Sequence, residues 1–87
     1  MSKKEFQLPM RKLKLIWDFK GPDGIKTAEH HAIHLKEYTA AKKYEDLTSG
    51  FEALHEFHAI AFLIVPESEM IPLRDALKPH RGQVYSE

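Results

Sequence analysis

One apolar run constrains the fold of this chain more than any other feature. All seven residues from Ala59 to Val65 are apolar, and the run follows His58. A strand that is apolar on both faces has to be covered on both faces. Seven residues also fall far short of the roughly 20 that a membrane-spanning helix needs. The sequence therefore predicts a central, doubly covered strand over residues 58–65 and no membrane segment.

A second strand is predicted over residues 11–19, where side chains alternate between apolar and polar. One face would carry Leu13, Leu15, Trp17 and Phe19. The other face would carry Lys12, Lys14, Ile16 and Asp18. Residues 1–10 are expected to form a tail or an additional edge strand, because Pro9 cannot donate a hydrogen bond to a sheet.

The segments between these strands predict two helices. The first follows a turn at residues 20–24, has Asp23 or Thr27 as its N-cap, and is expected to run to about Leu47. The second follows Pro66, with Ser68 as its N-cap and Pro72 in its first turn. Residues 51–57 fit either a short strand or one helical turn, and residues 83–85 fit a last edge strand.

The order of these elements predicts a single α+β domain over residues 1–87. It fits a ferredoxin-like sandwich in which a small antiparallel sheet carries two helices on one face. The other sheet face would carry large apolar side chains with no helix left to cover them. A patch of that size is unusual on a monomer, so we expect a homodimer that packs sheet against sheet.

Composition narrows the classes of function. Thirteen basic residues balance 13 acidic ones, which argues against nucleic-acid binding because that needs a basic excess. The chain contains no cysteine, so disulfides, thiolate nucleophiles and cysteine-type zinc sites are excluded. The first residues show no signal peptide, and a cytoplasmic location is expected.

Three segments carry a family resemblance. Residues 15–22 read as a strand with a Gly-Pro turn, residues 34–38 as a helix motif of the His-Leu-x-x-Leu type, and residues 62–68 as a strand leading into an acidic helix start. Together they resemble YCII-related proteins and, more broadly, the ferredoxin-like dimeric α/β-barrel proteins that include antibiotic-biosynthesis monooxygenases. The resemblance implies a dimeric fold and a small enzyme in which His34 takes the histidine position of a His–Asp dyad. The aspartate of that dyad precedes a proline in the family, whereas Lys78 precedes Pro79 here.

Three histidines of the first predicted helix form the main candidate site. His30, His31 and His34 fall within five residues, and positions three and four apart on a helix are neighbours. Imidazole gains or loses a proton near neutral pH and is the commonest metal ligand. The cluster therefore predicts either a divalent-metal site or an acid–base site, and a solvated polar helix face is the third interpretation.

The roles within such a site can be assigned from position. As an acid–base site, His34 would be the general acid or base and His30 the second choice, with Asp18 or Asp23 as the orienting carboxylate. In a metal site built on His30, His31 and His34, the candidate carboxylate ligands would be Asp18, Asp23, Glu67 and Glu69. No organic cofactor is expected.

A second histidine group and a glycine-rich turn are weaker signals. His55, His58 and His80 are expected at the sheet end opposite the first cluster. The turn at residues 21–27 lacks the contiguous Gly-Lys-Ser/Thr of a phosphate loop. The sequence favours a homodimeric binding module for a small molecule or partner, with a His34 enzyme and a histidine metal site as alternatives.

Overall fold

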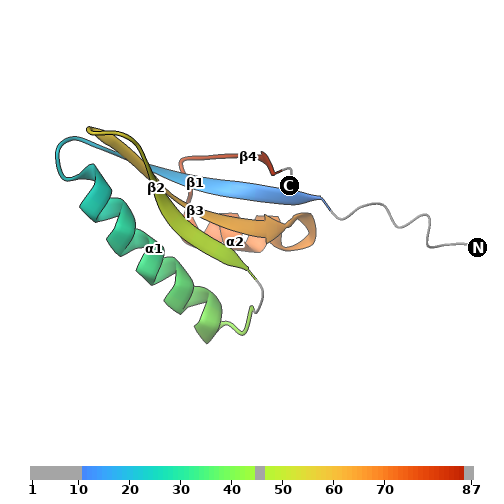
Figure 1. The fold of residues 1–87 in the computed structure, drawn as a ribbon. Coiled ribbons are helices and arrows are strands. Elements are labelled where there is room, and N and C mark those ends of the chain that lie inside the picture. Colours follow the sequence, from blue (N-terminus) through green and yellow to red (C-terminus); the bar gives the residue numbers. More distant parts are fainter. Residues whose placement is uncertain (1–10, 45–46, 86–87) are drawn as a thin grey trace, which may run out of the picture.

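The computed structural model describes residues 11–44 and 47–85 of the chain (Figure 1). The elements are β1 (Lys12–Lys20), α1 (Gly24–Ala41), β2 (Thr48–His55), β3 (His58–Pro66), the 3-10 turn η2 (Glu67–Glu69), α2 (Met70–Leu77) and β4 (Arg81–Tyr85). The tail or edge strand predicted over residues 1–10 lies outside the described residues.

The four strands form one antiparallel sheet in the order β2-β3-β1-β4. The two strands predicted from the sequence are its centre: β1 pairs with β3 along its whole length, from Lys12 opposite Pro66 to Lys20 opposite His58. This order, with one helix before β2 and one before β4, is compatible with a ferredoxin-like arrangement. The α+β class and the central position of residues 58–65 are therefore confirmed.

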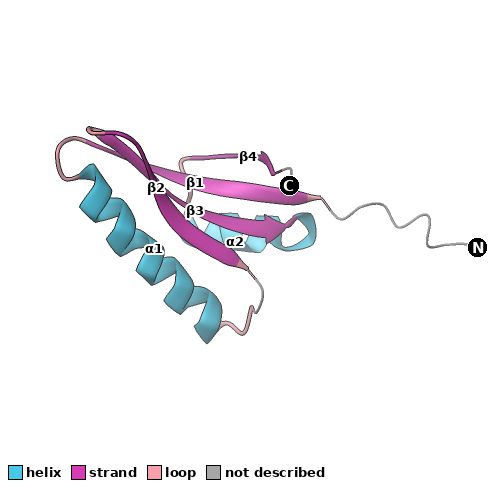
Figure 2. Cartoon of the chain, viewed as in Figure 1, coloured by secondary structure: helices cyan, strands magenta, loops and turns pink. Residues whose placement is uncertain are grey.

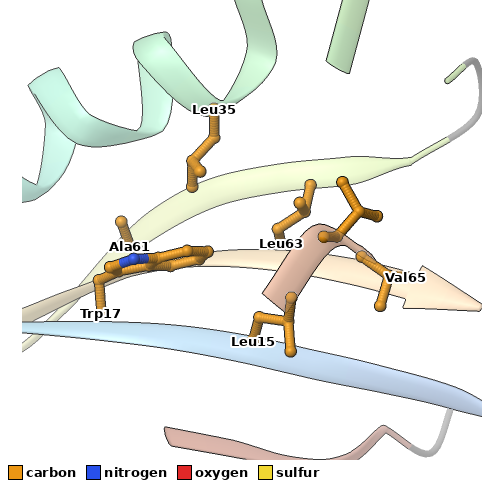
Figure 3. Packing of buried hydrophobic residues seen from close by; sticks show 7 residues of the cluster. Leu15, Trp17, Leu35, Ala61, Leu63 and Val65 are labelled. Atoms are coloured by element: carbon orange, nitrogen blue, oxygen red, sulfur yellow. The ribbon is translucent and has the colours of Figure 1, made fainter. Parts of the chain in front are cut away.

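Both helices lie on the same side of the sheet, as predicted (Figure 2). The core between helices and sheet consists of Leu15, Trp17, Leu35, Ala61, Leu63, Val65 and Leu73 (Figure 3). Trp17 is 3% exposed, and its Nε1 donates a hydrogen bond of 3.0 Å to the carbonyl oxygen of Leu77. This bond satisfies the buried indole N–H and ties the end of α2 to β1.

The sheet face turned away from the helices, called the open face below, is covered in part by its own side chains. It carries the alternate positions Lys14, Ile16, Asp18, Ile60, Phe62 and Ile64. Ile16, Ile60 and Ile64 are only 2%, 4% and 8% exposed within the single chain, and Lys14 Nζ lies 4.6 Å from the centroid of the Phe62 ring. Sheet-to-sheet dimerisation stays a prediction, but it is not needed to bury these three isoleucines, which are already buried in the single chain.

The first helix ends earlier than the sequence predicts, at Ala41 and not near Leu47. Lys43 adopts a left-handed backbone with φ of 64°. Its N–H donates to the carbonyl of Ala40, and the N–H of Tyr44 donates to the carbonyl of Thr39. These two bonds are those of a Schellman motif, which closes a helix C-terminus.

The remaining differences concern short segments. Residues 48–50, which directly follow the predicted end of the helix, begin β2, and the strand interpretation of residues 51–57 holds as far as His55. A bulge interrupts β2 between Ala53 and His55. Ser68 lies inside η2, so it is not the N-cap of α2, whereas Asp23 is the N-cap of α1 without a side-chain bond. No helix in the described residues combines the length and apolar character needed to span a membrane.

Candidate functional site

Asp18 is the centre of a polar cluster on the open face. Its carboxylate lies 2.8 Å from His58 Nε2, and it accepts bonds of 2.9 and 3.1 Å from Nε and Nη2 of Arg81. The strand register explains why His58 and Arg81 both lie beside Asp18. Asp18 lies opposite Ile60, two residues from His58, and Ile16 lies opposite Arg81, so both partners reach Asp18 diagonally across the sheet.

The negative charge of Asp18 is balanced within the cluster by the Arg81 guanidinium. The Asp18 side chain is 19% exposed, and the Arg81 guanidinium beside it, assisted by His58, holds the pKa of Asp18 well below its usual range. The carboxylate in turn raises the pKa of Arg81. Asp18 therefore stays ionised and binds its neighbours over a wide pH range, which suits a positioning residue.

The backbone of Asp18 extends the cluster to His80. The Asp18 N–H donates a bond of 2.8 Å to His80 Nδ1, and the His80 N–H donates a bond of 2.9 Å to the carbonyl of Ile16. Since Nδ1 accepts, a neutral His80 ring carries its proton on Nε2. Asp18 thus holds two consecutive residues by hydrogen bonds: His80, just before β4, and Arg81, the first residue of β4.

These two residues also line a groove between α2 and β4, called the α2/β4 groove. Its volume is about 450 Å³. The lining residues are Leu13, Leu15, Met70, Arg74, Pro79, His80, Arg81, Gly82, Gln83 and Val84. The walls are therefore mainly aliphatic, with Arg74, His80 and Gln83 as further polar residues of the lining. The Arg81 guanidinium is directed to Asp18 instead.

The predicted histidine cluster does not form a single site. His30 and His34 are exposed on the outer side of α1, with ring centroids 4.8 Å apart, and His34 Nδ1 lies 3.8 Å from Glu37 Oε1. Asp18 lies on the opposite face of the sheet, so the structure does not bring it to His34 or His30. Asp23 is exposed at the start of α1.

His31 points the other way, toward the sheet. Its ring centroid lies 5.0 Å from that of Trp17 and 5.5 Å from that of Phe19. Its Nε2 is buried and has no hydrogen-bond partner. Burial lowers the pKa of His31, and the nearby His34 and His80 lower it further. His31 is therefore part of the contact between α1 and the sheet.

The second histidine group lies at the same end of the sheet as the first, and the prediction of opposite ends is wrong. Phe19 contacts both groups, because its ring centroid lies 5.5 Å from His31 and 6.4 Å from His80. The reason is topological: α1 starts where β1 ends, and β3 starts beside that same point, with His58 opposite Lys20.

The acidic residues after β3 lie at the other end of the sheet. β3 ends opposite the first residue of β1, and Glu69 Oε1 there accepts a bond of 3.2 Å from the Tyr44 hydroxyl. Neither Glu67 nor Glu69 completes a ligand set with the helix histidines. Residues 11–44 and 47–85 contain no group of three or more histidine, aspartate or glutamate side chains that could hold a metal ion.

Sequence reasoning selected Asp18 but assigned it the wrong partners, and it missed Arg81 and the groove. One signal was present: Asp18 is the only acidic residue of the predicted strand 11–19, so within a sheet it needs a basic or donor side chain as its partner. The identity of that partner depends on the register between β1 and β4, which the sequence pattern does not specify.

Comparison with known proteins yields no match to this chain, whether among protein-family models, curated proteins or solved structures. The function proposed below therefore rests on geometry.

Proposed function

We propose that this protein is a small, cytoplasmic, homodimeric binding module. Its ligand would be a small molecule with an apolar body and an anionic group, held in the α2/β4 groove. The observation that carries the proposal is the groove itself, about 450 Å³ in volume, with mainly aliphatic walls and the nitrogen-bearing side chains of Arg74, His80, Arg81 and Gln83. Sites for small molecules are typically of this size and have mostly apolar linings with a few polar groups.

The missing side chain at Gly82 supports the proposal. A Cβ added there would lie 3.6 Å from Leu15 Cδ2, which is ordinary contact and not a clash. Glycine thus leaves space beside Leu15 that the fold itself would allow a larger residue to fill. Met70 on the facing helix adds a flexible, polarisable surface that adapts to a ligand's shape.

The charges at the groove favour an anion. Arg74, His80 and Gln83 bring N–H donors to the groove, and none of its lining side chains is acidic. Asp75 lies 3.4 Å from Arg74, but both side chains are more than half exposed, so this pair holds the guanidinium only weakly. Arg74 therefore remains able to turn toward a carboxylate.

Hexanoate, hexanol and hexylamine test the proposal because they share one chain length and differ in charge. Titrated into isotope-labelled protein, hexanoate should shift the amide signals of Gly82, Val84 and Met70, with a Kd of about 1 mM or tighter. Hexanol should bind more weakly, and hexylamine most weakly.

Two variants make the assignment specific. Gly82→Leu should fill the groove and abolish hexanoate binding. Gly50→Ala, in β2 and outside the groove lining, is the matched control and should bind like the wild type. If hexanoate leaves the groove signals unmoved, or if Gly82→Leu binds as well as the wild type, the proposal fails.

An acid–base enzyme is the second candidate, and one distance favours it. His58 Nε2 lies 2.8 Å from the Asp18 carboxylate, as in enzymes where a carboxylate orients a histidine that acts as a general base. His34 has a carboxylate only at 3.8 Å. Hydrolysis of p-nitrophenyl acetate faster than by free imidazole, lost in His58→Gln and kept in His34→Gln, would favour this candidate. Metal binding by His30, His31 and His34 has less support, because His31 faces the core.

A further inference from the structure

The outer edge of β4 differs from the other sheet edge. β4 occupies one end of the strand order, and among the described residues only β1 pairs with it (Figure 1). Exposed edges are usually protected by charges, prolines or bulges. β2, at the other end, has a bulge between Ala53 and His55 and carries Glu52. β4 pairs with β1 without a register shift, has no proline, and directs its one charged side chain, Arg81, to Asp18.

One strongly exposed apolar residue lies on the same edge. Among residues 11–44 and 47–85, seven large hydrophobic side chains are at least 38% exposed, and none of them belongs to the open-face positions of β1 and β3. Val84 in β4 is the most exposed of the seven, at 57%. A β-branched residue that is exposed on an unprotected edge strand favours pairing with another strand.

We propose that a second copy of this chain pairs with β4, antiparallel to it, about a two-fold axis at Gln83. The sequence of β4 is complementary to itself in this register. Gly82 falls opposite the partner's Val84, so a small residue meets a large one. Arg81 falls opposite the partner's Tyr85, whose ring can lie against the aliphatic part of the Arg81 side chain while the guanidinium stays bonded to Asp18. Gln83 meets the partner's Gln83, and two amides can bond each other without opposed charges.

The pairing also completes the α2/β4 groove. Gly82 and Val84 lie on the helix side of the sheet and line that groove. In the proposed register the partner's Val84 lies beside Gly82, where this chain has no side chain, and it extends the apolar wall. The inference deepens the proposed function, since it rests on the homodimer, but it does not depend on the groove's ligand.

Mass in solution tests the interface. One five-residue strand pairing is small compared with stable protein interfaces, so the dimer should be weak and its mass should depend on concentration. Sedimentation equilibrium of the full chain should show the 10.1 kDa monomer at low concentration and a mass approaching twice that value at about 1 mM.

Charge substitutions at the axis locate the interface. Gln83→Lys and Gln83→Glu each oppose like charges across the axis, so each variant alone should remain monomeric. An equimolar mixture of the two should dimerise at least as well as the wild type. Glu52→Lys on the β2 edge is the control and should keep the wild-type mass. Circular dichroism should show that all four proteins fold alike, because both positions are exposed.

Three results would overturn the proposal: a monomeric wild type at about 1 mM, dimers of both single variants that are as strong as the wild type, or a dimer that Glu52→Lys removes. A wild-type protein that forms the dimer but does not bind hexanoate would instead reject the ligand proposal and leave the β4 interface standing. The two proposals can therefore fail separately.

Discussion

Asp18 in β1 and Arg81 at the start of β4 are joined by two hydrogen bonds, of 2.9 Å between Nε and Oδ2 and of 3.1 Å between Nη2 and Oδ1. They are 63 residues apart in the sequence. The same carboxylate meets His58 of β3 at 2.8 Å. One side chain of a central strand therefore connects the strands on both sides of it, and it fixes the point where the short edge strand begins.

Asp18→Ala should lower the free energy of unfolding by about 1–3 kcal/mol. The substitution removes bonds between charged groups and leaves Arg81 and His58 without their acceptor. Urea denaturation at neutral pH measures the loss. Asp75→Ala is the matched control: Asp75 also contacts an arginine, but at 3.4 Å and with 65% of its side chain exposed, so it should change stability by less than about 0.5 kcal/mol. Equal losses in the two variants would refute the special role of Asp18.

Acid should weaken the fold through Asp18. The pKa of this carboxyl is held below its ordinary value of 3.8 in the folded protein, so the unfolded chain takes up the proton first. The stabilisation is complete above pH 3.8 and is lost as the pH falls from there through the lower folded-state pKa. Asp18→Asn should be less stable than the wild type at neutral pH and should lose less on acidification. Unfolding measured at several pH values would refute this if the two proteins lost stability in parallel.

His31 should give a second pH dependence at higher pH. Burial lowers its pKa from the ordinary 6.5 in the folded protein. Stability linked to His31 is therefore complete above pH 6.5 and falls below it, because only the unfolded chain then binds the proton. His31→Leu removes this dependence and also the buried Nε2 that has no partner. It should stabilise the protein by about 1 kcal/mol, and by more at pH 5 than at pH 8.

The control for that substitution is Ile33→Leu, in the same helix and half exposed. It should follow the wild-type pH profile. A His31→Leu protein that is less stable than the wild type at pH 5 would contradict this. It would show that imidazole packing against Trp17 and Phe19 stabilises the fold by more than the unpartnered Nε2 destabilises it.

Much of the fold was predictable because it depends on local periodicity. The alternation at residues 11–19 and the apolar run at 59–65 identify the two central strands, and turn residues mark the start of α1. The end of α1 was not predictable in this way. Lys43 holds the left-handed position that glycine usually takes, so the sequence shows no stop signal there.

The site was predictable only in part, and the reason is physical. His30 and His34 are near each other because of helix spacing, which the sequence displays. The partners of Asp18 come from strands 40 and 63 residues away, and their meeting depends on strand register. A shift of one residue in either pairing would place His58 or Arg81 on the other face of the sheet. Asp18 could be selected as a candidate, but its cluster could not.

Gly24 should be far less tolerant of alanine than Gly50, although both sites are crowded. An added Cβ at Gly24 would lie 2.7 Å from the backbone oxygen of Phe19, which cannot move without shifting β1. At Gly50 the nearest atom is Cζ at the tip of the Phe62 ring, at 2.9 Å, and this half-buried side chain can swing aside by a small change in χ1. We expect Gly24→Ala to cost about 1–3 kcal/mol and Gly50→Ala to be close to neutral. Comparable unfolding midpoints for the two variants would contradict this.

Lys43→Gly should stabilise the protein, because residue 43 closes α1 with a φ of 64° that glycine adopts without strain. The Schellman bonds use only the backbone, from Lys43 N–H to the Ala40 carbonyl and from Tyr44 N–H to the Thr39 carbonyl, so glycine keeps them. The expected gain is about 0.5–1 kcal/mol. Lys42→Gly is the matched control: residue 42 has a φ of −91°, where glycine only adds entropy to the unfolded chain, and this variant should be destabilised. Thermal unfolding of the two variants beside the wild type separates these outcomes. A lower Tm for Lys43→Gly than for the wild type would contradict the prediction. It would show that the lysine side chain stabilises the fold by more than its left-handed backbone destabilises it.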